Sequence, residues 1–79
     1  MKLRILSLKG IKYEGEVSGL NVKTSSGEIT VLDNHRSLIT SLKNGTAYII
    51  TKAGERVPVE IKSGFLEKGN GDELSLLVD

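Results

Sequence analysis

The apolar residues of this chain occur in short runs that end at turn residues, and no run keeps the 3.6-residue period of a helix. The most regular run is Arg56–Lys62, in which apolar and other residues alternate. Its apolar set is Val57, Val59 and Ile61. Strict alternation predicts a strand with one buried and one exposed face. Because Pro58 cannot donate a hydrogen bond to a neighbouring strand, we expect this strand at a sheet edge.

The same kind of run recurs along the whole chain and predicts eight strands. They are Leu3–Leu8, Ile11–Val17, Leu20–Lys23, Glu28–Leu32, Thr46–Thr51, Arg56–Lys62, Gly64–Lys68 and Glu73–Val78. In the second of these, the alternation places Ile11 on the same face as Tyr13, Gly15 and Val17. Glycine-containing turns separate the runs, and GNGD (Gly69–Asp72) is a strong hairpin signal. We therefore expect one all-β domain over residues 1–79, an antiparallel β-sandwich or flattened barrel of about eight to ten short strands.

Length and composition limit how such a domain is stabilised and what it binds. A chain of 79 residues without cysteine has neither disulfides nor thiolate metal sites, and with a single histidine any zinc site would need carboxylates as its other ligands. The formal net charge is +1 and the basic residues are scattered, which is not typical of a nucleic-acid-binding surface. No apolar run approaches the roughly 20 residues of a membrane-spanning helix, so we expect any membrane association to come through a partner.

The segment around the only histidine, His35, contains the residue types of a hydrolytic triad. Asp33 and Ser37 flank it at two-residue spacing. Alternate side chains on an extended segment share a face, but a working triad also needs an oxyanion hole and a substrate pocket, and neither is indicated here. Asp33 and His35 also do not complete a metal shell. We therefore expect a turn in which the side chains of Asp33 and Asn34 bond to the local backbone.

Two further patterns carry little functional weight. GNGD lacks the lysine of a phosphate-binding loop, and the N-glycosylation acceptor pattern Asn44-Gly45-Thr46 matters only in a secreted chain.

Two functions other than docking stay open. The second hypothesis is a small nucleic-acid-binding β-barrel, and the third is an enzyme. The barrel would need aromatic rings for base stacking, and the chain has three, Tyr13, Tyr48 and Phe65.

Two segments have large apolar residues on both faces, which indicates a protein that works by docking. In Thr46–Thr51, Tyr48 and Ile50 lie on the face opposite Ala47 and Ile49. The run Leu38, Ile39 and Leu42 has the same character. Such residues are either enclosed within the domain or covered by a partner.

The stretch GEITVLDNHRSLITSLKNG (Gly27–Gly45) resembles the signature of the N-terminal β-sandwich domain of the ATP synthase epsilon subunit. The matching positions are Gly27, Thr30, Val31, Leu32, His35, Leu38, Thr40, Leu42 and Gly45. YEGEV (Tyr13–Val17), SGFLE (Ser63–Glu67) and LSLLVD (Leu74–Asp79) follow the order of the family, so the resemblance covers the whole chain.

This resemblance implies a non-catalytic rotor subunit of the central stalk, peripheral at the cytoplasmic face of the bacterial inner membrane. It implies two partners, the gamma subunit and the c-ring, and it implies no cofactor, no nucleic acid, no direct membrane insertion and no homo-oligomer. Carried over by position, the c-ring contact consists of Ser26, Gly27 and Glu28. The gamma contact consists of Ser7, His35 and Thr40.

The chain departs from the family pattern at four places. Asp33 and Ser37 stand where the family usually has proline, which loosens the loop, and Ser63 replaces the first of two glycines. The sequence ends at Asp79, where many relatives continue into a C-terminal helical hairpin that binds ATP or brakes rotation. The resemblance therefore leads us to expect a short form with neither activity.

Overall fold

Nine strands make up the computed structural model, which describes all of residues 1–79. They are β1 (Lys2–Ser7), β2 (Gly10–Glu16), β3 (Gly19–Thr24), β4 (Gly27–Leu32), β5 (Leu38–Leu42), β6 (Gly45–Ile50), β7 (Arg56–Ile61), β8 (Gly64–Lys68) and β9 (Glu73–Val78). All eight expected strands are present, with ends within one residue of those expected. No helix is long and apolar enough to cross a membrane.

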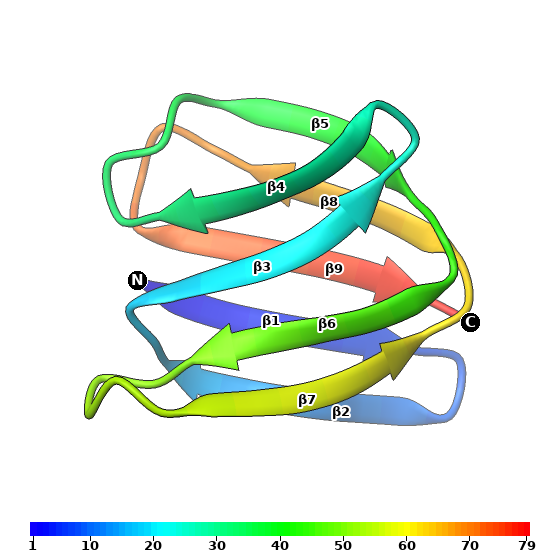
Figure 1. Ribbon diagram of the computed structural model, residues 1–79, viewed down its shortest axis with the longest axis horizontal. Coiled ribbons are helices and arrows are strands. Elements are labelled where there is room, and N and C mark those ends of the chain that lie inside the picture. The colour runs from blue at the N-terminus through cyan, green and yellow to red at the C-terminus, as the bar shows by residue number, and fades with distance from the viewer.

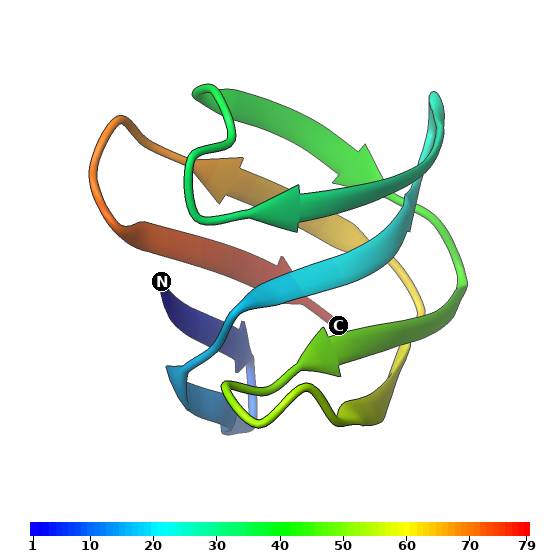
Figure 2. The same ribbon diagram turned by 60° about the vertical axis from the view of Figure 1, so that its left-hand side comes forward.

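The strands form a single hydrogen-bonded sheet that curls over into two layers (Figure 1). The strand order is β2-β1-β9-β8-β5-β3-β6-β7, and β4 pairs with β3. One layer contains β2, β1, β9, β8 and β5, and the other contains β4, β3, β6 and β7; Figure 2 shows the two layers facing each other. At the free edges, Lys12 Nζ donates a hydrogen bond of 3.2 Å from β2 to the Glu60 carbonyl of β7. The expected sandwich and the edge position of Pro58 in β7 are both confirmed.

One strand pair departs from the expected antiparallel arrangement. β1 and β9 run parallel, from Lys2 opposite Glu73 to Leu6 opposite Leu77. A parallel pair cannot be joined by a tight hairpin and needs a long connection. Here the other seven strands form that connection, because β1 and β9 lie at opposite ends of the chain.

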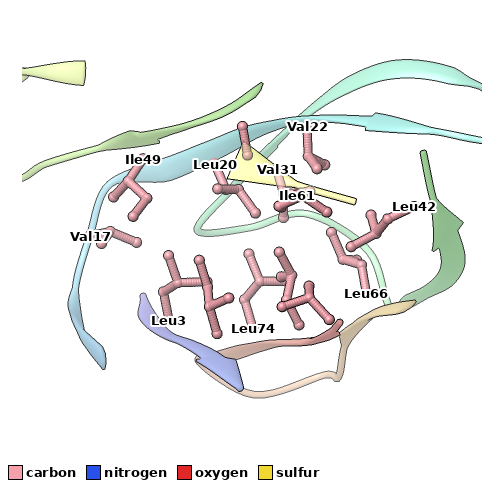
Figure 3. Packing of buried hydrophobic residues seen from close by; sticks show 14 of the residues in the cluster. Leu3, Val17, Leu20, Val22, Val31, Leu42, Ile49, Ile61, Leu66 and Leu74 are labelled. Carbon is pink, nitrogen blue, oxygen red and sulfur yellow. The ribbon is translucent and has the colours of Figure 1, made fainter. Parts of the chain in front are cut away.

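The core lies between the two layers and is built from a cluster of hydrophobic side chains (Figure 3). Leu3 and Leu74 project from one layer toward Leu20 and Ile49 of the other. The buried residues of this hydrophobic cluster are Met1, Leu3, Ile5, Val17, Leu20, Val22, Val31, Leu42, Ala47, Ile49, Ile61, Leu66, Leu74, Leu76 and Val78. Each large side chain buried in this way contributes roughly 1.5–3 kcal/mol relative to an exposed one.

The side-chain alternation expected along β2 is wrong at its start. Tyr13 pairs with Ile5, but the next pair is Ile11 with Leu6, so Lys12 is an extra residue in a β-bulge. The bulge shifts the alternation by one residue, and Ile11 consequently faces outward with 62% of its surface exposed. Beyond the bulge the expected face is kept, because Tyr13 packs against the core and Val17 is buried in it.

The outward apolar residues of β6 are covered by their own neighbours. Tyr48 lies beneath Arg56, whose guanidinium carbon is 4.9 Å from the ring centroid. Ile50 and Leu32 both lie over Gly19, where a Cβ would come within 3.4 Å of Ile50 Cδ1 and 2.7 Å of Leu32 Cδ2. These contacts leave both β6 side chains half-buried within the domain.

The turn before β9 is the expected hairpin, and a buried cation closes it. Lys68, at the end of β8, is only 2% exposed. Its Nζ donates hydrogen bonds to the carbonyls of Gly69 (3.2 Å) and Gly71 (2.9 Å). The aliphatic stem therefore packs in the core while the ammonium group stabilises the turn.

Candidate docking surfaces

The first candidate surface is the tip of the β3–β4 hairpin, where the predicted c-ring contact residues lie together. Ser26, Gly27 and Glu28 are all exposed. Thr24 stabilises the tip, because its hydroxyl accepts a hydrogen bond from the Ser26 N–H (3.1 Å) and donates one to the Gly27 carbonyl (2.6 Å). Gly27 has a φ of 124°, a conformation that side chains disfavour.

The carboxylate of Glu28 is held in a fixed direction. Its Oε2 accepts a hydrogen bond of 3.0 Å from Asn21 Nδ2, and Asn21 also donates to Thr30 Oγ1 at 3.0 Å. No lysine or arginine pairs with this carboxylate. The tip therefore presents an oriented negative charge to the surroundings, which suits a basic partner residue.

The second candidate surface is an apolar face on the outer side of the β2-β1-β9-β8-β5 layer. The strand register aligns Ile11 with Leu6, Leu6 with Leu77, and Leu77 with Phe65. Ile39 lies beside this row on β5. Phe65 and Ile39 are 61% and 73% exposed, although side chains of this size are usually buried. We refer to Leu6, Ile11, Ile39, Phe65 and Leu77 as the apolar face.

Two grooves hollow the apolar face on either side of Phe65. One, of about 570 Å³, runs between Phe65, Leu77 and Leu8. The other, of about 320 Å³, runs between Phe65, Ile39 and Leu6. Contiguous exposed apolar surface of this kind marks a site that a partner covers.

Sequence reasoning identified only part of the apolar face. Ile39 belongs to a run that indicated docking, whereas the other four residues of the face were not predicted to dock a partner. Ile11 faces outward only because of the β-bulge, and the alignment of Phe65 with Leu77 depends on the pairing of β8 with β9. The sequence nevertheless indicated one outward leucine in this strand. Leu76 and Leu77 are adjacent, so their side chains must lie on opposite sides of the sheet.

The predicted gamma-contact residues lie along the strand direction and do not form one cluster. Ser7 is at the end of β1, where its hydroxyl accepts a hydrogen bond from the Lys9 N–H (3.2 Å). Thr40 is half-buried in the middle of β5 and pairs with Leu66. His35 is half-buried in the β4–β5 turn, at the opposite end of the strands from Ser7 (Figure 1). A single partner would have to be elongated to contact all three.

Asp33, His35 and Ser37 do not contact one another as a triad. Ser37 Oγ donates a hydrogen bond to Asn70 Oδ1 of the β8–β9 turn. His35 Nδ1 lies 2.9 Å from the Arg36 carbonyl, and the His35 N–H closes the turn on the Leu32 carbonyl at 3.0 Å. Each side chain therefore has a separate structural contact.

The expectation that the Asp33 side chain bonds to the local backbone is wrong. Its carboxylate instead lies 2.9 Å from the α-ammonium group of Met1. The ammonium group is buried, donates a hydrogen bond to the Val17 carbonyl (3.1 Å), and has Glu16 and Asp72 at 3.6 Å each. The hydrogen bond to Asp33 raises the pKa of the ammonium group above its ordinary value and lowers the pKa of the Asp33 carboxyl. The turn is thus tied to the start of β1 by charge.

The three aromatic rings lie on different faces and do not form a stacking platform. Tyr13 packs against the core, Phe65 is on the apolar face, and Tyr48 is under Arg56 on the opposite layer. Proteins that bind single strands place several rings along one groove. The arrangement therefore does not favour the nucleic-acid alternative.

Comparison with known proteins identifies the family of this chain. The family model for the ATP synthase delta/epsilon chain, beta-sandwich domain, matches residues 1–79. The ATP synthase epsilon chain of Clostridium kluyveri is 37% identical over 79 residues, which is 100% of this chain and 59% of that protein. The epsilon chain of Clostridium novyi is 35% identical over 78 residues, with 99% and 59% covered. The chain therefore spans less than two thirds of the length of these relatives.

Solved structures share the fold at low sequence identity. A chain of the Euglena gracilis mitochondrial ATP synthase (OSCP/F1/c-ring) superposes with a TM-score of 0.90 at 18% identity, over 96% of this chain and 48% of that chain. A chain of the Tetrahymena thermophila central stalk and c-ring structure gives 0.81 at 13% identity, over 99% and 62%. The chain belongs to the family of the ATP synthase delta/epsilon beta-sandwich domain.

Proposed function

We propose that this chain is a non-catalytic central-stalk subunit of a rotary ATP synthase, where it links the gamma subunit to the c-ring and helps to couple ion flow to ATP synthesis. Its place would be the cytoplasmic face of the bacterial inner membrane, as a peripheral part of the complex. The observation that carries this proposal is the presence of two adjoining, chemically different docking surfaces on one small sandwich whose family occurs in this enzyme.

The apolar face suits the gamma subunit. A rotor contact must persist through each turn, and permanent contacts are usually apolar at their centre. Ser7 lies at one end of this face, and Thr40 is the chain neighbour of Ile39 on β5, with its side chain on the inner side of the strand opposite Leu66. In this arrangement His35 would contact gamma at the far end of β5, which fits a long partner lying along the strands.

The hairpin tip suits the c-ring. Ser26 and Gly27 present backbone and small side chains, and Glu28 presents an oriented carboxylate. A basic residue on a polar loop of the ring would pair with this carboxylate, and an exposed pair of that kind gives orientation more than affinity.

Joint capture tests the proposal. The tagged chain is expected to copurify with a gamma subunit and with a c-ring from the same source. Glu28→Lys is expected to reduce ring capture in a salt-dependent way and leave gamma capture intact, whereas Phe65→Ser reduces gamma capture. Absence of binding to both partners at micromolar concentration contradicts the proposal.

Two matched variants serve as controls. Glu55→Lys makes the same charge change in the β6–β7 turn, at the opposite end of the strands. Tyr48→Ser removes a comparable ring from the outer side of the other layer. If Glu55→Lys weakens ring capture as much as Glu28→Lys does, Glu28 is not at the ring contact.

A further inference from the structure

A cluster of lysines with no carboxylate partner lies at the end of the strands that carries the hairpin tip. Lys9, Lys12 and Lys62 line a pocket of about 600 Å³ together with Ser7, Leu8 and Asp79. None of these lysines forms an ion pair, and the Asp79 carboxylate accepts a hydrogen bond from Ser63 Oγ (2.6 Å). The pocket therefore places three lysines against the single side-chain carboxylate of Asp79, which leaves its lining side chains with a net positive charge.

The connections at this end of the molecule have an unusual composition. Leu8–Lys9, Ser25–Ser26, Lys43–Asn44 and Lys62–Ser63 all lie on the right in Figure 1. They contain three lysines and no carboxylate, whereas the opposite connections contain the carboxylates of Asp33, Glu55 and Asp72 together with Arg36 and Lys52. The exposed charges thus distinguish one end of the domain from the other.

Leu8 adds a second, independent feature. It lies between Ser7 and Lys9 at the tip of the β1–β2 turn, and its side chain is completely exposed, at 102% of the reference value. No other large apolar side chain of the protein is as exposed. An exposed leucine among lysines suits an interface that is apolar in its depth and anionic at its surface, which describes a bilayer of acidic phospholipids.

We propose that this lysine pocket binds the phosphate groups of an anionic membrane surface, with Leu8 entering the headgroup layer. This proposal rests on the proposed function in one respect, the orientation of the domain. A hairpin tip docked on the c-ring turns the end of the domain that carries the lysine pocket toward the membrane. It changes the expectation that membrane association comes only through a partner. The lipid contact orients the domain, and it supplements the protein contacts.

Vesicle binding tests the proposal without gamma or c-ring. The chain is expected to cosediment with vesicles that contain phosphatidylglycerol, but not with pure phosphatidylcholine vesicles, and to dissociate at high ionic strength. Lys9→Gln/Lys62→Gln is expected to weaken binding on the order of 20-fold, and Leu8→Ser about tenfold. The charge-matched control Arg36→Gln/Lys52→Gln, at the opposite end, is expected to bind as the unchanged chain does.

The other outcomes each overturn the proposal. Equal binding to neutral vesicles, or equal losses in the two double variants, shows that the lysine pocket is not the site. Binding of inorganic phosphate without binding to vesicles indicates a small-anion site, and binding of a single-stranded oligonucleotide without vesicles indicates a nucleic-acid site. Lys9→Gln/Lys62→Gln leaves capture of gamma and the c-ring unchanged, so failure here is distinguishable from failure of the proposed function.

Discussion

Ser41 on β5 donates a side-chain hydrogen bond of 2.7 Å to Ser25 in the turn of the β3–β4 hairpin, 16 residues away. A backbone bond runs the other way, from the Ser25 N–H to the Ser41 carbonyl, at 3.1 Å. Ser41 also pairs with Phe65 across the sheet. The hairpin tip and the apolar face are therefore joined through one residue.

Ser41→Ala is expected to loosen the hairpin tip. The loss of one exposed hydrogen bond lowers the free energy of unfolding by about 0.5–1 kcal/mol. The amides of Ser26 and Gly27 then exchange faster with solvent, which hydrogen exchange followed by NMR measures. Ser26→Ala, whose hydroxyl has no hydrogen-bond partner, is the control, and equal exchange in the two variants contradicts the linkage.

Substitutions at two adjacent residues of β8 are expected to have different effects on stability, because one side chain is in the core and the other is on the apolar face. Leu66→Ala removes a fully buried side chain and lowers the free energy of unfolding by about 2–5 kcal/mol. Phe65→Ser alters an exposed side chain and changes stability by about 0.5 kcal/mol or less. Urea unfolding measures both. A large loss of stability in Phe65→Ser shows that the apolar face stabilises the fold.

Gly64→Ala is expected to destabilise the domain by more than about 2 kcal/mol. Gly64 has a φ of 149°, and a Cβ there would lie 2.0 Å from the Leu77 carbonyl oxygen of the adjacent strand. Gly69→Ala is the matched control, because its Cβ meets no atom within 4 Å. Thermal unfolding compares the two. Of the two glycines in the family pattern at this place, the chain keeps the second, Gly64, which the backbone conformation requires. Ser63 replaces the first.

The ion pair between Met1 and Asp33 predicts how stability depends on pH. The pKa of the Met1 ammonium group is raised above 8.0, so its stabilisation is complete below about pH 8 and is lost as the pH rises through the folded-state pKa. The pKa of Asp33 is lowered from 3.8, so its stabilisation is present above that value and is lost as the pH falls through the folded-state pKa.

Asp33→Asn is expected to lower the free energy of unfolding at neutral pH. It is also expected to weaken the dependence of that free energy on pH, on both the acid and the alkaline side. Urea midpoints measured from acid to alkaline pH provide the test. Glu55→Gln, a carboxylate without an ion pair, is the control. An unchanged profile in Asp33→Asn shows that the ion pair does not contribute to folding.

Most of the fold was predictable from the alternation of apolar and polar residues. Regular strands such as Arg56–Ile61 were located because one buried face requires a two-residue period. β5 was not assigned as a strand, since Ile39 faces outward and Thr40 and Ser41 interrupt its apolar residues. The reversal at Ile11 was not predictable, because a bulge is a property of strand pairing and leaves no fixed pattern in a single strand.

The candidate sites also include one that was predictable from the sequence and one that was not. The residues at the hairpin tip are consecutive in the chain, so Ser26, Gly27 and Glu28 were bound to lie together. The apolar face draws residues from five strands, and its alignment depends on register. The partner of Asp33 is the start of the chain, a contact that no local rule connects with a turn 32 residues later.

The sequence by itself determined eight of the nine strands and most of their turns, because alternation and glycine act over a few neighbouring residues. Only the tertiary structure decided which apolar residues remain outside, which lysines gather at one end, and which carboxylate meets the buried ammonium group. Those outcomes depend on pairing between strands distant in the chain, and a one-residue change of register exchanges the buried and exposed faces of a strand.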